Sequence, residues 1–173
     1  MKKNNSKKGR VFWITGYSGS GKTEIAKKIK KFINKKFGKT LIISGDDLRD
    51  IFFLKKYDKK SRIKYALAYS KFCKLVSNQG INVVISTVSL FNQVRSWNKK
   101  NISKYTEIYI KSELSEIINF NKKREIYDVK KNIMGKNIKA QLPKKPNIFL
   151  KNDFSKTINQ LSKDLIQKIN KKY

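Results

Sequence analysis

The chain has no histidine and one cysteine, Cys73, among its 173 residues. Without histidine it has no histidine general base or metal ligand, so Ser-His-Asp and Cys-His catalysis within the chain are excluded. A single cysteine cannot close an internal disulfide and fits a reducing compartment. No apolar run approaches the ~20 residues of a membrane-spanning helix, and the basic N-terminus lacks the apolar segment of a signal peptide. These absences predict a cytoplasmic protein without a membrane partner.

Acidic residues and arginine are also scarce. Asp and Glu number 12 against 42 Lys and Arg, which gives a formal net charge of +30, and only 5 of the 42 are Arg. A strongly basic chain suggests a nucleic-acid partner, but such surfaces normally use arginine for its planar, stacking fork. We therefore interpret most lysines as solvated helix faces and expect no nucleic-acid partner. Because hydrophobic residues make up 39% of the chain, a packed core is expected despite the charge.

Two apolar patterns alternate along the chain. Short β-branched runs predict buried strands, and apolar residues three or four apart predict amphipathic helices. The expected strands span residues 10–15, 40–44, 81–88, 106–111 and 147–150; the expected helices span 22–37, 46–53, 60–78, 90–100, a segment from about 113, and 154–173. This alternation favours right-handed crossovers and a parallel sheet covered on both faces. We predict one α/β domain over residues 1–173, with a five-stranded parallel sheet between two helical layers.

A glycine-rich turn between the first expected strand and helix carries the strongest chemical signal. Its sequence, GYSGSGKT, matches the phosphate-binding pattern G-x-x-x-x-G-K-[ST] in the strand–helix context that the pattern requires. Glycines let backbone N–H groups point at phosphate oxygens, while lysine reaches the β- and γ-phosphates and the threonine hydroxyl meets Mg²⁺. ATP and Mg²⁺ are therefore expected on Gly16, Ser18, Gly19, Ser20, Gly21, Lys22 and Thr23, with Thr23 as the metal ligand.

The second expected strand runs into the sequence SGDDLR at residues 44–49. Ligands of an open parallel sheet sit beyond the carboxyl ends of its strands, so Asp46 and Arg49 are expected to face the same crevice as the phosphate loop. An aspartate there can orient or deprotonate an attacking hydroxyl, and an arginine can grip an anionic acceptor through two parallel hydrogen bonds. Asp46 also fits an alternative role as the N-cap of the short helix that follows.

These two segments together resemble the adenylylsulfate kinase family, and further matches follow in the same order. Tyr57 and Arg62 resemble the aromatic residue and the arginine of the family's F-S-x-x-D-R segment. The run VSLF at residues 88–91, followed by Arg95, resembles its I-S-P-Y-x-x-D-R segment. Its lid pattern is matched by Gly135, Asn137, Pro143 and Pro146. The resemblance covers about residues 10–153 and implies a three-layer sandwich of the P-loop NTPase type.

The family transfers the γ-phosphate of ATP to the 3′-hydroxyl of adenylyl sulfate, and the resemblance implies that reaction here. It implies catalytic roles for Lys22, Asp46 and Ser89, and acceptor contacts from Asp46, Arg49, Phe53, Tyr57, Arg62 and Arg95. Since no histidine can activate Ser89, we expect it to have a structural or substrate-contact role and not a nucleophilic one. Residues 122–146 would form a lid that excludes water. The family is commonly dimeric, so a homodimer is also implied.

The departures from the family pattern cluster at the acceptor and the lid, while the phosphate loop is intact. Ser44, Asp47, Tyr65 and Leu90 stand where the family has aspartate, asparagine, asparagine and proline. The acceptor therefore stays open between adenylyl sulfate and another nucleotide. Residues 86–98 also resemble divergent members from surface-polysaccharide loci, some of which are thought to phosphorylate a cytidine-nucleotide analogue. A third hypothesis is a basic nucleic-acid-binding protein with a regulatory ATP site, whose binding would weaken steeply with salt.

Overall fold

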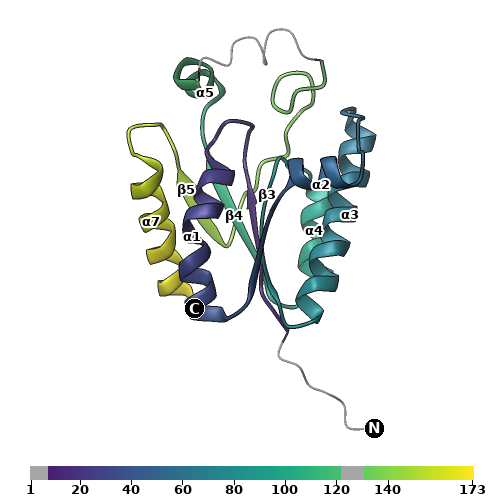
Figure 1. The fold of residues 1–173 in the computed structure, drawn as a ribbon. Coiled ribbons are helices and arrows are strands. Elements are labelled where there is room, and N and C mark those ends of the chain that lie inside the picture. The colour runs from purple at the N-terminus through teal and green to yellow at the C-terminus, as the bar shows by residue number, and fades with distance from the viewer. Residues whose placement is uncertain (1–7, 122–130) are drawn as a thin grey trace.

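The computed structural model describes residues 8–121 and 131–173. The elements, in chain order, are β1 (Val11–Thr15), α1 (Lys22–Phe37), β2 (Thr40–Ser44), α2 (Gly45–Ile51), α3 (Lys59–Asn78), β3 (Asn82–Thr87), α4 (Asn92–Asn101), β4 (Tyr105–Lys111), α5 (Leu114–Asn121), β5 (Ile148–Lys151) and α7 (Ile158–Lys172) (Figure 1). The strands form one parallel sheet in the order β2-β3-β1-β4-β5. The predicted five-stranded parallel sheet is confirmed.

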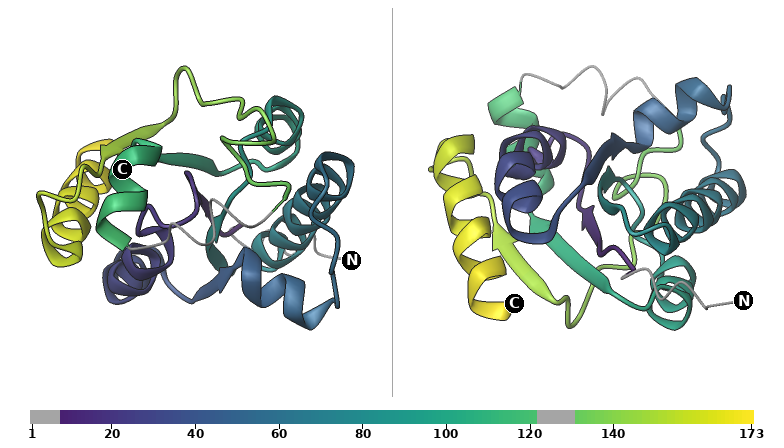
Figure 2. Two further views of the ribbon diagram at one scale, coloured as in Figure 1. Left: turned by 90° about the horizontal axis from the view of Figure 1, so that it is seen from above. Right: turned by 60° about the horizontal axis from the view of Figure 1, so that its bottom comes forward.

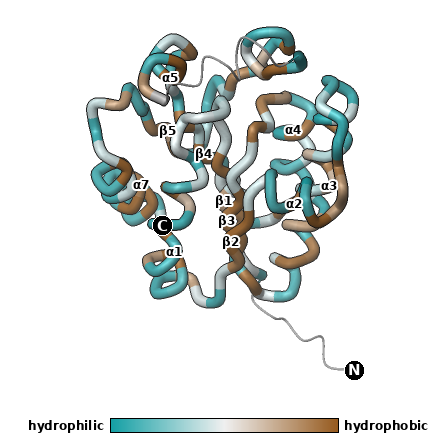
Figure 3. Tube along the Cα trace, turned by 45° about the horizontal axis from the view of Figure 1, so that its top comes forward, coloured by the Kyte–Doolittle hydropathy of each residue, from teal (hydrophilic) through white to brown (hydrophobic). Residues whose placement is uncertain are grey.

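Helices cover both faces of the sheet, α1 and α7 on one face and α2, α3 and α4 on the other (Figures 1 and 2). Residues of β1 divide between the two cores: Phe12 and Ile14 pack with α1 and α7, while Val11 and Trp13 pack with the opposite layer. Since strand side chains alternate between faces, a strand buried on both faces is apolar throughout. Figure 3 shows this hydrophobic centre between more polar helices. None of the described helices is long and apolar enough to cross a bilayer.

The start of α2 differs from the expectation in a way that matters to the site. Ser44 caps the helix, because its Oγ accepts a hydrogen bond from the Asp47 backbone N–H at 3.1 Å. In return, Asp47 Oδ2 accepts a hydrogen bond from the Ser44 N–H at 2.7 Å. This capping box satisfies N–H groups that a helix start leaves free. The alternative role of Asp46 as the N-cap is therefore wrong.

Two other expected segments shift. The last helix begins at Ile158 instead of residue 154, because Thr157 and Gln160 form a capping box there. The expected lid over residues 122–146 is described only from residue 131, and residues 122–130 lie outside the described part of the chain. Residues 131–147 contain no helix or strand apart from one isolated bridge between Met134 and Ile138.

Asn82 joins three segments at the amino end of the sheet. Its Oδ1 accepts a hydrogen bond from the Arg10 N–H at 2.9 Å. Its Nδ2 donates to the carbonyl oxygens of Phe37, Gly38 and Lys39 at 3.0, 3.2 and 3.1 Å. The side chain is buried, and its hydrogen bonds link β3 to the residue before β1 and to the turn between α1 and β2.

We expect Asn82→Ala to lower the free energy of unfolding by about 2–3 kcal/mol, because the variant removes a buried amide whose hydrogen bonds join three segments. Urea unfolding followed by circular dichroism measures the change. Asn159→Ala, an exposed residue of α7, is the matched control and should change stability by less than about 0.5 kcal/mol. Equal effects in the two variants would contradict the role of Asn82.

Candidate functional site

The turn between β1 and α1 curls so that backbone N–H groups gather at one point. Gly19 and Gly21 have φ angles of 83° and 82°, a region that favours glycine. Gly21 is the N-cap of α1, so the first N–H groups of the helix open onto the turn. The Lys22 side chain folds back over the loop, with Nζ 2.5 Å from the Tyr17 carbonyl oxygen. N–H donors, the helix N-terminus and one ammonium group thus converge, which suits a phosphate chain.

Oxygen atoms suited to a hard cation lie beside this loop. Thr23 Oγ1 is 3.1 Å from Ser86 Oγ at the carboxyl end of β3, and the Asp46 side chain lines the same cavity. Mg²⁺ is usually held by a few protein oxygens together with waters and substrate phosphates. These three side chains therefore fit the metal that the phosphate loop implies. The described residues contain no group of three or more His, Cys, Asp or Glu that could hold a metal by themselves.

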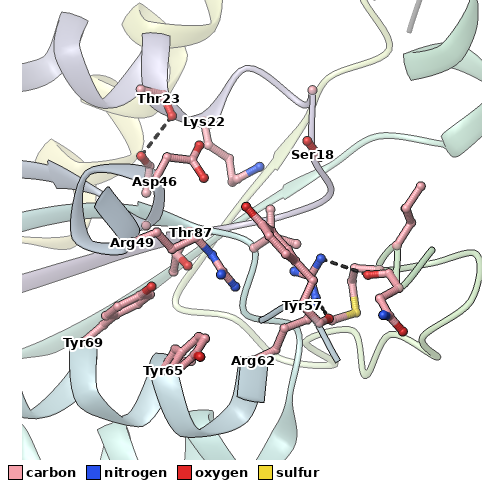
Figure 4. A pocket seen from close by; sticks show the side chains of 18 of the residues that line it. Ser18, Lys22, Thr23, Asp46, Arg49, Tyr57, Arg62, Tyr65, Tyr69 and Thr87 are labelled. Carbon is pink, nitrogen blue, oxygen red and sulfur yellow. Dashed lines mark hydrogen bonds between the residues drawn. The ribbon is translucent and has the colours of Figure 1, made fainter. Parts of the chain in front are cut away.

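One cavity of about 870 Å³ joins the phosphate loop to α2, α3 and residues 131–134. Of the predicted site residues, it is lined by Ser18, Gly19, Gly21, Lys22, Thr23, Asp46, Arg49, Tyr57 and Arg62. Gly16 and Ser20 belong to the loop without lining this cavity. Figure 4 shows Lys22, Asp46 and Arg49 extending into the same space. The volume is within the range of nucleotide-sized sites.

Arg49 is held firmly on the side of the cavity that α2 and α3 form. Arg49 donates from Nη1 to the backbone oxygens of Leu54 and Lys56, at 2.8 and 3.1 Å. Its guanidinium carbon lies 4.2 Å from the ring centroid of Tyr57 and 5.3 Å from that of Tyr65. The Arg49 guanidinium is thus held in place by two aromatic rings and by the loop that follows α2.

Arg62 links α3 to the segment after residue 130. Its Nε donates to the Tyr57 backbone oxygen at 2.8 Å, and its Nη2 donates to that of Asn132 at 2.9 Å. Burial, and then the neighbouring charge of Arg49, lower the pKa of Arg62. Two guanidinium groups held this close to each other favour an anionic ligand, which would relieve their repulsion.

Arg95, expected at the acceptor, does not line the cavity. It is buried, and its Nη2 donates to Asn92 Oδ1 at 2.6 Å and to the Gln141 carbonyl oxygen. Its Nε lies 3.6 Å from Oε1 of the buried Glu107 on β4. Burial raises the pKa of Glu107, and the Arg95 charge opposes that rise. In this structure Arg95 ties α4, β4 and the segment after residue 138 together.

Two further expected residues also lie away from the cavity. Ser89 is buried at 2% exposure, and its Oγ has no hydrogen-bond partner among the described residues. Phe53 is 82% exposed and has a φ of 52°, because the chain turns sharply after α2. The loop after α2 directs Tyr57 to the cavity instead, so of the two aromatic residues expected to contact the acceptor, Tyr57 lines the cavity and Phe53 does not.

The cavity also contains side chains that the motifs did not predict as site residues. They include Tyr65, Tyr69, Ser86 and Thr87. The tyrosines follow Arg62 at intervals of three and four residues, so helical spacing along α3 carried a signal for them. Ser86 and Thr87 lie at the end of a strand that was predicted correctly, but nothing in the sequence of that strand indicated that their hydroxyl groups line a cavity.

A model of the adenylylsulphate kinase family matches residues 8–151. The chain belongs to the adenylylsulphate kinase family. A cytidine diphosphoramidate kinase of Campylobacter jejuni is 37% identical over 108 residues, which make up 62% of this chain and 64% of that protein. An adenylyl-sulfate kinase of Clostridium acetobutylicum is 30% identical over 152 residues, 82% of this chain and 74% of that protein.

Solved structures share the fold of this family member. The structure of the Mycobacterium tuberculosis APS kinase in complex with AMPPNP and APS superposes with a TM-score of 0.81, covering 94% of this chain and 98% of that one. At 20% identity, this likeness establishes the fold alone. The matching region spans 64% of the Campylobacter relative and 62% of a probable adenylyl-sulfate kinase of Pyrococcus abyssi, less than two thirds of each.

Arg95→Met tests whether Arg95 has the internal role seen in this family member. We expect the free energy of unfolding to fall by about 3 kcal/mol or more, because the Glu107 carboxyl group would remain buried without its cation. The double variant Arg95→Met/Glu107→Leu should recover much of that loss in urea unfolding. Unchanged stability together with a raised KM for the acceptor would instead make Arg95 an acceptor contact.

Proposed function

We propose that this protein is an ATP-dependent kinase that phosphorylates a hydroxyl group of a small nucleotide acceptor. The observation that carries the proposal is a single cavity lined by the phosphate loop with Lys22, the carboxylate of Asp46 and the guanidinium groups of Arg49 and Arg62. The loop supplies a place for the donor phosphates, and the arginines supply one for an anionic acceptor. Family membership supports the same reaction class.

The reaction needs no covalent enzyme intermediate. The acceptor oxygen forms a bond to the γ-phosphorus of ATP, the bond from that phosphorus to the bridging oxygen breaks, and ADP leaves. Asp46 orients the acceptor hydroxyl and takes its proton, while Lys22 stabilises charge on the transferred group. Thr23, with Ser86 nearby, would hold Mg²⁺, which would supply positive charge to the phosphates. The burial of Ser89 away from the cavity supports direct transfer.

Two acceptors are supported by different observations. The family model and the relative from Clostridium favour the 3′-hydroxyl of adenylyl sulfate. The 37% identity with a cytidine diphosphoramidate kinase favours a cytidine diphosphate compound. The cavity wall departs from the family pattern on this side: Ser44 and Asp47 form the capping box of α2, and the ring of Tyr65 lies beside Arg49.

An acceptor screen tests the proposal. The full chain is incubated with ATP and Mg²⁺ together with either adenylyl sulfate or cytidine diphosphoramidate, and ADP release is measured against a reaction without acceptor. We expect one of the two to raise ADP release well above that background. If neither does, the kinase proposal fails. Binding to duplex or single-stranded nucleic acid that weakens steeply with salt would then favour the nucleic-acid hypothesis.

Lys22→Ala should reduce kcat by a factor of about 100 or more with whichever acceptor is active, because the transferred phosphoryl group would lose its cation. Lys30→Ala, which removes an exposed lysine from the same helix, serves as the control and should keep its activity. This comparison separates a local role from the effect of net charge. Similar losses in both variants would mean that the overall positive field accounts for the activity.

Arg49→Lys should raise the KM for the acceptor by about tenfold and leave the KM for ATP unchanged. A lysine keeps the charge but cannot donate to the loop after α2 and hold an anion with the same planar fork. Steady-state kinetics with each substrate varied in turn measures the two constants. Unaltered acceptor kinetics would remove Arg49 from the acceptor site.

A further inference from the structure

Tyr69 is a buried side chain whose hydroxyl has no partner. It lies on α3, is 3% exposed, and lines the cavity one helical turn after Tyr65. Among the described residues, no atom forms a hydrogen bond with its hydroxyl. A buried hydroxyl left without a partner costs about 1–3 kcal/mol, so such a group calls for a function.

The ring of Tyr69 does not require this hydroxyl for packing. The ring belongs to the hydrophobic core between α3 and the sheet, together with Ala66 and Cys73. A phenylalanine has the same shape and would fill that space without burying an unpaired polar atom. Packing of the core therefore does not account for the Tyr69 hydroxyl group, whereas a ligand that enters the cavity would.

The surroundings of Tyr69 indicate the chemistry of that ligand. Figure 4 shows Tyr65 and Tyr69 extending from α3 on the side of Arg49. Arg49 is held by the rings of Tyr57 and Tyr65, so its guanidinium keeps a constant place at this wall. Burial raises the pKa of Tyr69 to about 12, with Arg49 opposing the rise. The phenol therefore stays protonated near neutral pH and can donate a hydrogen bond next to a cation, a combination that suits an anionic oxygen.

We propose that the Tyr69 hydroxyl donates a hydrogen bond to a phosphate-type oxygen of the acceptor nucleotide, and that this contact helps to select the acceptor. The inference rests on the proposed function for the identity of the ligand as the acceptor. Lys22 and the phosphate loop hold the donor at the other end of the cavity, so the contact affects the acceptor alone. A site with a buried donor discriminates strongly against ligands that leave it unpaired.

Tyr69→Phe removes one oxygen atom and keeps the ring. We expect the variant to bind the acceptor, or the probe cytidine 5′-diphosphate, about tenfold more weakly. This is the effect expected from the loss of one hydrogen bond to a charged group. Binding of Mg-ADP should be unchanged. The melting temperature of the free protein should stay equal or rise, because the variant buries no unpaired hydroxyl. Calorimetric titration and thermal melting measure these quantities.

Tyr105→Phe is the matched control, since Tyr105 also carries a buried hydroxyl but lies on β4 and does not line the cavity. Its nucleotide binding should equal that of the wild type. A Tyr69→Phe protein that binds cytidine 5′-diphosphate and adenylyl sulfate as tightly as the wild type would overturn the inference, as would a lowered melting temperature with unaltered binding. A wild type that binds neither nucleotide would overturn it as well.

The two proposals can fail separately. A wild type that turns over an acceptor, with Tyr69→Phe unaltered in acceptor KM, would leave the kinase standing and remove Tyr69 from recognition. A wild type that binds these nucleotides without phosphorylating them, with binding weakened in Tyr69→Phe, would remove the kinase and keep the recognition site.

Discussion

The burial of β1 at the centre of the sheet is the constraint on which the site depends. All five of its residues are buried, and it pairs in parallel with β3 on one side and β4 on the other. Thr15 is in register with Thr87, and Ser44 of β2 with Ser86. Because parallel strands end at one edge, the phosphate loop, α2 and the hydroxyls of β3 meet there. The packing of one apolar strand thus assembles groups from three separate segments.

The capping of α2 determines how the few carboxylates are used. Asp47 and Ser44 satisfy the helix start between themselves, so Asp46 is free to line the cavity beside Lys22. In a chain with 12 acidic and 42 basic residues, a carboxylate at this point is distinctive. The surplus positive charge adds a field that would attract anionic ligands, most effectively at low salt.

Arginine is used where several contacts converge, although not always on a ligand. Arg49 and Arg62 line the cavity and also hold backbone carbonyls of neighbouring segments. Arg95 makes its contacts entirely inside the protein, and Arg10 lies 3.7 Å from the ring centroid of Tyr173 at the other end of the sheet. The planar fork explains all four, since it can donate in several directions while stacking. An arginine in this lysine-rich chain therefore marks a position with several contacts, which can be made either to a ligand or within the protein.

The order of strands and helices along the chain, the phosphate loop, and the place of Asp46 and Arg49 after the second strand could all be predicted from the sequence. Each of these features depends on residues that are close together in the sequence, either through hydrophobic periodicity or through a contiguous motif. They can therefore be recognised without knowing how the helices and strands pack. The burial of Ser89 and Arg95 away from the cavity, the exposure of Phe53 and the position of Tyr69 in the cavity wall depend on the tertiary structure. A motif places a residue along the chain, but the direction of its side chain follows from how helices pack on the sheet.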